Sequence, residues 1–189
     1  MNSDNRTHAG HVRVYQYTDN NWQQLGSDID GEATLDQSGW SVSLSADGTI
    51  LAIGALYNDA NGTNSGHVRV YQYTDNNWEQ MGYDIDGDAL GINAATGISC
   101  VSLSANGKIV AFGTNTNDGN GSHSGHVRMY QYTNNNWQQL GYDIEGEVAH
   151  EHSGRSVSLS ADGSIVAIGA NYSNVNGRYS GRVYIYELI

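Results

Sequence analysis

Residues 11–26 read HVRVYQYTDNNWQQLG, and nearly the same letters return twice further along the chain. The copies are HVRVYQYTDNNWEQMG at residues 67–82 and HVRMYQYTNNNWQQLG at residues 126–141, so the offsets are 56 and 59 residues. A repeat of this length indicates one structural unit copied along the chain, with each copy burying its surface against the next.

A second block, SVSLSADGTILAIGA from Ser41, returns from Cys100 and from Ser156 with offsets of 59 and 56 residues. The three extra residues of the middle copy therefore lie between Gly82 and Cys100, in a loop that leaves the strands intact. The sequence predicts a single repeat domain over residues 1–189, with repeats at about 11–66, 67–125 and 126–181 and a terminal strand at 182–189.

Each repeat contains the signals of four strands. Val42 and Leu44 alternate with serines, and Asp47-Gly48 then supplies a tight turn into the apolar run ILAIGA. A Gly/Asn-rich loop leads to the third strand, HVRVYQY, and an Asn-Asn turn precedes a short fourth strand that starts at Trp78.

A four-stranded sheet of this kind cannot bury both of its faces alone, so it must pack on copies of itself. We therefore predict an all-β fold of β-propeller blades, each with four antiparallel strands and about three blades per chain. A β-solenoid-like stack is the alternative, but solenoid coils use fewer residues per turn than the repeat offers.

The repeat also carries a family resemblance. Gly39, the run LAIGA from Leu51, the stretch GHVRVY from Gly66 and the downstream Trp78 together resemble the FG-GAP repeats of integrin-like β-propellers. The resemblance implies a propeller fold and an adhesive role outside the cell. Members of the family that bind calcium carry a long Asp/Asn loop between the first two strands of a blade, where this chain has only Ala-Asp-Gly at residues 46–48.

The chain ends are out of phase with the repeat, because the sequence opens at a third strand and stops at a third strand. This gives 13 predicted strands, or three blades and one strand over, and three blades are too few to close a propeller. We expect self-association through the open blade edges, with two chains forming a six-bladed ring, or membership of a longer array. The strands at residues 11–17 and 182–189 would compete for the same position within one ring.

The composition limits the classes of partner that this chain can bind. The formal net charge is −12 with only eight Lys and Arg, which argues against nucleic acid, and no apolar run is long enough for membrane insertion. The first ten residues lack the apolar core of a signal peptide, so an extracellular or cell-surface location would need a signal outside this chain. Cys100 stands where the other copies have Ser, which favours a small buried residue.

An acidic loop follows the fourth strand of every repeat and is the candidate metal site. Alternating carboxylates around a glycine can offer Ca²⁺ the oxygen ligands that it prefers. The alternative is that the acids cap the turn by accepting backbone hydrogen bonds. The candidate ligands are Asp28, Asp30, Glu32, Asp84, Asp86, Asp88, Asp143, Glu145 and Glu147.

Two further features are candidates for ligand binding. The loop before the third strand alternates oxygen-bearing side chains, at Asp59 and Asn61 and again at Asp118 and Asn120, although an Asx-type turn explains this pattern as well. Trp40 is an aromatic residue that does not repeat, since its equivalents are Ile98 and Arg155, and it therefore favours contact with a ligand.

Other polar and aromatic residues recur with the repeat and favour structural roles. The arginine of the third strand is expected to pair with an acid between blades, and the histidine two residues before it to hold no metal. The repeated Tyr and Trp residues could stack on sugars, but regular strand positions favour packing between blades. These positions are Arg13, Arg69, Arg128, His11, His67, His126, Tyr15, Tyr17, Tyr71, Tyr73, Tyr130, Tyr132, Trp22, Trp78 and Trp137.

The sequence predicts a non-catalytic binding or adhesion module that recognises a glycan or a protein through repeated surfaces. Catalysis needs a unique constellation of residues, whereas nearly every polar feature here occurs three times. A structural subunit of a self-assembling fibre, ring or surface layer is the alternative. An enzyme, such as a glycosidase with residues at the propeller axis, is the least favoured interpretation.

Overall fold

The computed structural model describes residues 7–88 and 97–188, and within them it contains strands, turns and loops but no helix. There is accordingly no helix in this part of the chain that is long and apolar enough to cross a membrane. The fifteen strands of the described residues are β1 His11–Thr18, β2 Asn21–Asp30, β3 Ser38–Leu44, β4 Ile50–Ala55, β5 His67–Thr74, β6 Asn77–Gln80, β7 Ile85–Asp86, β8 Cys100–Leu103, β9 Ile109–Thr114, β10 His126–Thr133, β11 Asn136–Gln139, β12 Ile144–Glu145, β13 Ser153–Leu159, β14 Ile165–Ala170 and β15 Arg182–Glu187.

The strands form four antiparallel sheets, and neighbours in each sheet are also neighbours in sequence except for the short strands β7 and β12, which pair with β5 and β10. Two sheets are complete, with the orders β3-β4-β5-β6 and β8-β9-β10-β11. The chain begins with a two-stranded sheet, β1-β2, and ends with a three-stranded sheet, β13-β14-β15. The prediction of an all-β fold built from four-stranded antiparallel units is therefore confirmed.

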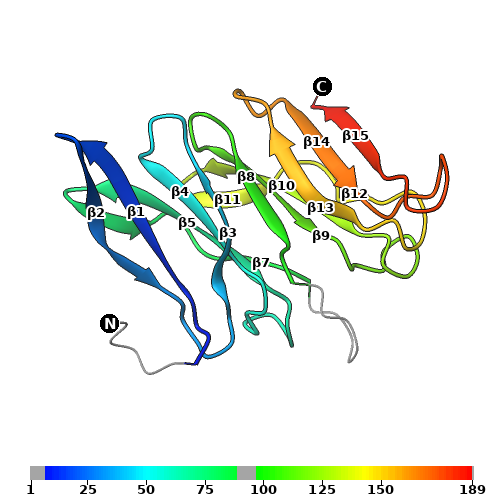
Figure 1. The fold of residues 1–189 in the computed structure, drawn as a ribbon, viewed down its shortest axis with the longest axis horizontal. Helices are drawn as coiled ribbons and strands as arrows, with labels where there is room; N and C mark the ends of the chain where they lie inside the picture. The colour runs from blue at the N-terminus through cyan, green and yellow to red at the C-terminus, as the bar shows by residue number, and fades with distance from the viewer. Residues whose placement is uncertain (1–6, 89–96, 189) are drawn as a thin grey trace.

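The four sheets stand face to face in a row that follows the sequence from β1 to β15 (Figure 1). The first strands of successive sheets, β3, β8 and β13, contact one another along one side of this row. The chain thus makes an arc of separate sheets, as in a propeller, and not the continuous coils of a solenoid.

An apolar core fills each of the three joints between sheets. Val14 and Ile29 of the first sheet meet Leu51 and Ile53 of the second, and the middle joint is centred on Phe112. The last joint packs Val127 and Met129 against Val166 and Ile168. The strand β4 is buried along its whole length, as its continuous apolar run predicts.

Main-chain and serine hydrogen bonds tie the sheets together along the first strands. The backbone N–H groups of Val101 and Leu103 donate to the hydroxyls of Ser41 and Ser43 on the preceding sheet, both at 3.0 Å. The turns at the strand tips are also linked, because Ala46 N donates to Ala105 O and Ala105 N donates to Ala161 O. The polar residues that alternate with Val42 and Leu44 therefore hold one sheet to the next.

The fourth strand of each complete sheet is divided into two pieces, so the prediction of 13 strands is corrected. Gly82 and Gly141 lie at the break with φ of 72° and 68°, a left-handed backbone that glycine adopts without strain. The short pieces β7 and β12 then pair again with β5 and β10.

The two end strands do not compete within the chain. β1 pairs with β2 at one end of the arc, and β15 pairs with β14 at the other end. Each end sheet is incomplete, since β1-β2 supplies third and fourth strands while β13-β14-β15 supplies the first three.

Candidate functional site

The acidic loops lie at the joints between sheets, and the side chains of each loop contact two successive sheets. In the second sheet, Asp84 and Asp86 flank the start of β7, and Asp88 follows Gly87. Asp84 lies against His67 of its own sheet, whereas Asp88 reaches Arg128 of the next sheet. The alternating acids of one loop therefore serve different neighbours instead of surrounding one common point.

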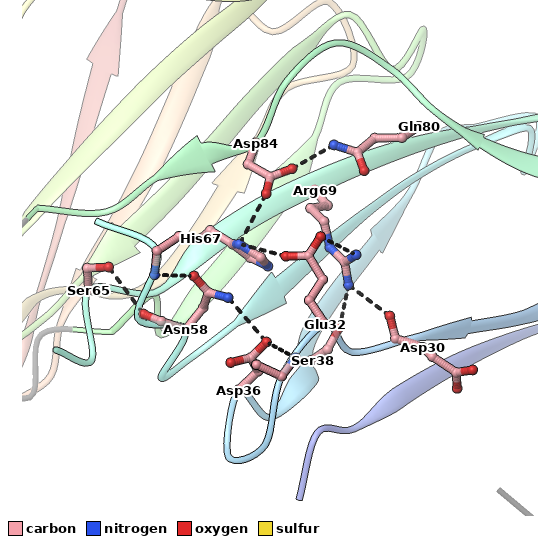
Figure 2. Close-up of polar contacts among 12 residues, drawn as sticks. Asp30, Glu32, Asp36, Ser38, Asn58, Ser65, His67, Arg69, Gln80 and Asp84 are labelled. Atoms are coloured by element: carbon pink, nitrogen blue, oxygen red, sulfur yellow. Dashed lines mark hydrogen bonds and ion pairs between the residues drawn. The ribbon is translucent and has the colours of Figure 1, made fainter. Parts of the chain in front are cut away.

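The first joint gathers two carboxylates around a buried histidine and an arginine (Figure 2). Nδ1 of His67 lies 3.5 Å from an oxygen of Asp84 and 3.9 Å from one of Glu32, while Glu32 also lies 3.4 Å from the guanidinium of Arg69. Arg69 donates to the carbonyl of Asp30 at 3.0 Å, and Gln80 donates to Asp84 at 2.6 Å.

The second joint repeats this cluster with a tighter arginine. The guanidinium of Arg128 lies 2.6 Å from Asp88 and 2.7 Å from Asp143, so it bridges an acid from each sheet. His126 lies 3.9 Å from Asp88. The prediction that the repeated arginine pairs with an acid between sheets is confirmed at both joints.

Burial controls the charge of the two histidines. Both are 1 % exposed, and among the described residues their ring nitrogens have no hydrogen-bond partner. Burial, helped by the charge of Arg69, lowers the pKa of His67 to about 4 against the pull of Asp84. Burial and Arg128 lower the pKa of His126 in the same way. Both rings are therefore neutral at pH 7.

The acids respond to the arginine. Burial opposes ionisation of Asp143, but hydrogen bonds from Arg128 and Gln139 together with the arginine charge outweigh it and lower the pKa of this carboxyl. Burial and the nearby Asp84 raise the pKa of Asp86. The carboxylate that touches the arginine is thus the one stabilised in its charged form.

The two clusters are also the groups of described residues that could hold a metal ion. In the sets Glu32, His67, Asp84 and Asp88, His126, Asp143, one ligand atom from each residue lies within 4.8 Å of the others. One imidazole and two carboxylates suit a transition metal better than Ca²⁺, which takes six to eight oxygens. The arginine beside each set already neutralises a carboxylate.

The remaining predicted metal ligands lie apart from these sets. Asp28 accepts from Arg13 at 2.8 Å and from Gln24, and these bonds lower its pKa to about 2. Asp30 contributes its carbonyl to Arg69, and Asp86 and Glu145 pair through the backbone with the two histidines. Glu147 lies 2.7 Å from Arg182 in the last joint.

The last joint departs from the pattern because its residues differ. Arg182 takes the repeat position of the histidine, and Tyr184 that of the arginine. The hydroxyl of Tyr184 donates to Glu151 at 2.9 Å. A tyrosine at this position therefore still contacts an acid, but one in the connection that leads into β13 of its own sheet.

The second set of predicted ligand residues forms hydrogen bonds with the backbone of nearby loops. Asp59 accepts from the N–H of Asn64 at 2.7 Å, and Asp118 accepts from that of His123 at the same distance. Asn61 donates to the carbonyl of Gly87, and the equivalent Asn120 donates to that of Gly146, both at 2.9 Å. The aspartates thus close their own loops, while the asparagines fasten each loop to the acidic loop of the same sheet.

Trp40 is exposed and lines a cleft. Its side chain is 52 % exposed, whereas Ser99, which the offset of 59 residues and the strand register place at this position instead of Ile98, is buried. The cleft measures about 200 Å³ and runs over three successive sheets, with Tyr57, Asn115 and Arg155 among its other walls. Sequence reasoning did not select Arg155 as a site residue, although the same comparison of repeats that singles out Trp40 also shows that this arginine is unique.

The regularity of the sheets agrees with a known repeat family. The FG-GAP repeat matches the chain at residues 28–71 and again at residues 146–186. Both of these regions are similar to the FG-GAP repeat. These matches include the first and last of the three blocks that begin at residues 41, 100 and 156. FG-GAP repeats favour a β-propeller binding module over an enzyme. Among curated proteins, no relative matches the chain.

Solved structures resemble the arc of four sheets. A protein assigned as a 6-phosphogluconolactonase from Bacteroides uniformis is 16% identical with a TM-score of 0.60, over 95% of this chain and 44% of that chain. Hydrazine synthase of Kuenenia stuttgartiensis is 13% identical with a TM-score of 0.57, over 94% and 46%. The chain therefore spans less than half the length of these structures, and identities this low show the propeller-like fold alone.

Proposed function

We propose that this FG-GAP repeat protein is a non-catalytic, extracellular binding module that recognises a glycan in the cleft beside Trp40. The observation that carries the proposal is that Trp40 and Arg155, the two residues that break the repeat at one position, both line the same cleft. Residues freed from the packing of the repeat are available for another role.

The chemistry of the cleft suits a sugar. An exposed indole offers an apolar face with a polar edge, as sugar rings require, and Arg155 and Asn115 add hydrogen-bond donors at the walls. The volume of about 200 Å³ is below the range of drug-sized pockets, which favours the end of a chain or a single sugar unit. A protein ligand remains the alternative occupant.

The repeated aromatic residues support a confined site. Trp78 and Trp137 are each 7 % exposed and are buried in the joints, where their indole N–H groups donate to the carbonyls of Leu25 and Met81. They are not available as stacking platforms. Recognition through every repeat, as the sequence pattern allows, is therefore less favoured than recognition at the cleft that Trp40 and Arg155 share.

A glycan array followed by calorimetry with the best ligand tests the proposal. We expect Trp40→Ala and Arg155→Ala each to weaken binding at least about tenfold, a loss of about 1.4 kcal/mol or more. Tyr83→Ala is the matched control, since its side chain is 79 % exposed and lies outside the cleft. Unchanged binding in both cleft variants, or binding to a protein and to no glycan, would refute the proposal.

A further inference from the structure

The first two joints between sheets each include a contact made by the fourth strand of the later sheet. Nε1 of Trp78 donates to Leu25 O at 2.9 Å, and Nε1 of Trp137 donates to Met81 O at 2.7 Å. In each case the indole lies beside a glycine of the earlier sheet, Gly26 or Gly82. We call this place the tryptophan slot.

The last joint has the walls of a tryptophan slot without a tryptophan. A cavity of about 200 Å³ is lined by Met129, Leu140, Gly141 and Ile144, with Val166 and Tyr186 opposite. Their equivalents in the middle joint, which include Val70, Met81, Ile85 and Val110, belong to the core around Trp137. A Cβ placed on Gly141 would meet no described atom within 4 Å, whereas one on Gly26 would lie 2.9 Å from Trp78.

The other end of the chain has the tryptophan without a slot. Trp22 is 64 % exposed, although it pairs with Tyr17 at the same ring distance, 5.2 Å, as Trp137 with Tyr132. On β3, Val42 and Leu44 are 51 % and 48 % exposed, while the equivalent Val101 and Leu103 are both 7 % exposed. The first sheet lacks the two strands that would cover them.

We infer that these two ends bind each other between two copies of this chain. The hairpin β1-β2 of one copy joins β13-β14 of the other as third and fourth strands, and Trp22 enters the slot formed by Leu140 and Gly141. Ser156 and Ser158 of β13 are both exposed. The same arrangement places their hydroxyls where they can accept hydrogen bonds from β3 of the second copy, as Ser41 and Ser43 accept from β8.

Closure fixes the number of copies at two. An interface between different faces of identical chains forms a ring if the rotation closes and a filament if it does not. Apart from β15, the strands of one copy amount to three complete sheets, because β1-β2 and β13-β14 together equal one. Two copies therefore provide six sheets, and known propellers have four to eight. Solved propellers that match this chain are likewise more than twice as long as the part it covers.

Strand β15 gives way to β1 of the second copy in this ring. β15 and β1 each bury one residue, Tyr184 or Val14, but Leu188 stands where β1 has Tyr17, so only β1 brings the ring partner of Trp22. Charges agree with the exchange. Arg69 and Arg128 each reach an acid of the preceding sheet, Glu32 or Asp88, and the next acid in this series is Glu147. Glu147 pairs with Arg182 of β15 and becomes available to Arg13 once β15 leaves.

Mass measurement by light scattering after size-exclusion chromatography tests the inference on the full chain. We expect twice the 20.4 kDa of one chain, and the mass of one chain for Trp22→Ala and for Leu44→Asp. Both side chains are about half exposed or more within one chain, so a far-UV circular dichroism spectrum like that of the wild type will show that the variants fold. Tyr83→Ala, an exposed aromatic on a complete sheet, should remain a dimer.

Cross-linking locates the contact. In the middle joint the side chain of Asn136 accepts from Tyr83 N at 3.1 Å, and the equivalent pair across the two copies is Asn21 and Tyr142. Mixed under oxidising conditions, Asn21→Cys and Tyr142→Cys, both also carrying Cys100→Ser, should form a disulfide-linked heterodimer. A monomer at every concentration, a mass that grows beyond two chains, or a dimer indifferent to Trp22→Ala would overturn the inference.

Discussion

Replacing Arg128 by methionine removes the cation that joins Asp88 to Asp143 across the second joint. The guanidinium lies 2.6 Å and 2.7 Å from the two carboxylates, and its side chain is only 14% exposed. Breaking a buried ion pair on one side costs about 3–5 kcal/mol, because the partner charge stays behind unpaired. The two carboxylates are 29% and 25% exposed and water can reach them. We therefore expect a loss of about 2–4 kcal/mol in the free energy of unfolding.

Urea unfolding followed by circular dichroism measures this loss, with Arg178→Met as the control. Arg178 is exposed and lies over the ring of Tyr179, and no ion pair joins it to another described residue. A triple variant that also carries Asp88→Asn and Asp143→Asn should recover part of the stability, since no buried charge is then unpaired. A loss below about 1 kcal/mol, the range of exposed pairs, would refute the reasoning.

The pH dependence gives the same experiment a second readout. The folded state lowers the pKa of Asp143 below its ordinary value of 3.8. A carboxyl with a lowered pKa adds stability that is present above its unfolded pKa and is lost as the pH falls through the folded pKa. The difference between wild type and Arg128→Met should therefore shrink as the pH falls below about 4.

Three further outcomes follow from the joints. In the folded state the pKa of His67 is about 4, below its ordinary 6.5. The folded protein should therefore lose stability as the pH falls from 6.5 to 4. The urea midpoint of His67→Gln should depend less on pH in this range. Gly113→Ala should unfold the chain at a clearly lower temperature, because its Cβ would lie 2.0 Å from Gly154 O, whereas Gly54→Ala, with its nearest contact at 3.4 Å, should be tolerated in the same thermal scan. Millimolar Ca²⁺ should leave the melting temperature as it is in EDTA, and a rise of several degrees would show that the acidic loops bind calcium as their sequence pattern predicts.

The strands could be predicted from the sequence because their signals are local. The alternation around Val42, the turn at Asp47-Gly48 and the apolar run from Ile50 each act within a few residues, and β3 and β4 lie where these signals place them. The break in the fourth strand was missed, since Gly82 interrupts pairing through its backbone and leaves the apolar pattern unchanged.

The clusters at the joints could not be predicted in this way. Glu32, His67 and Asp84 belong to separate elements, and they meet only because one sheet stacks on the next. The sequence pattern instead suggested that neighbouring acids such as Asp84 and Asp86 act together. Repeat equivalence was the more informative signal, because it identified Trp40 and applies equally to Arg155.

The hydrogen bonds that link Ala46, Ala105 and Ala161 involve only the main chain. The links themselves therefore do not depend on which side chains leave the turns. Thr49 and Ser164 instead bond to the aspartates of their own turns, Asp47 and Asp162. Because backbone atoms link successive turns, substitutions at the turns leave these links in place. New chemical groups can therefore be introduced there by selection or by protein engineering.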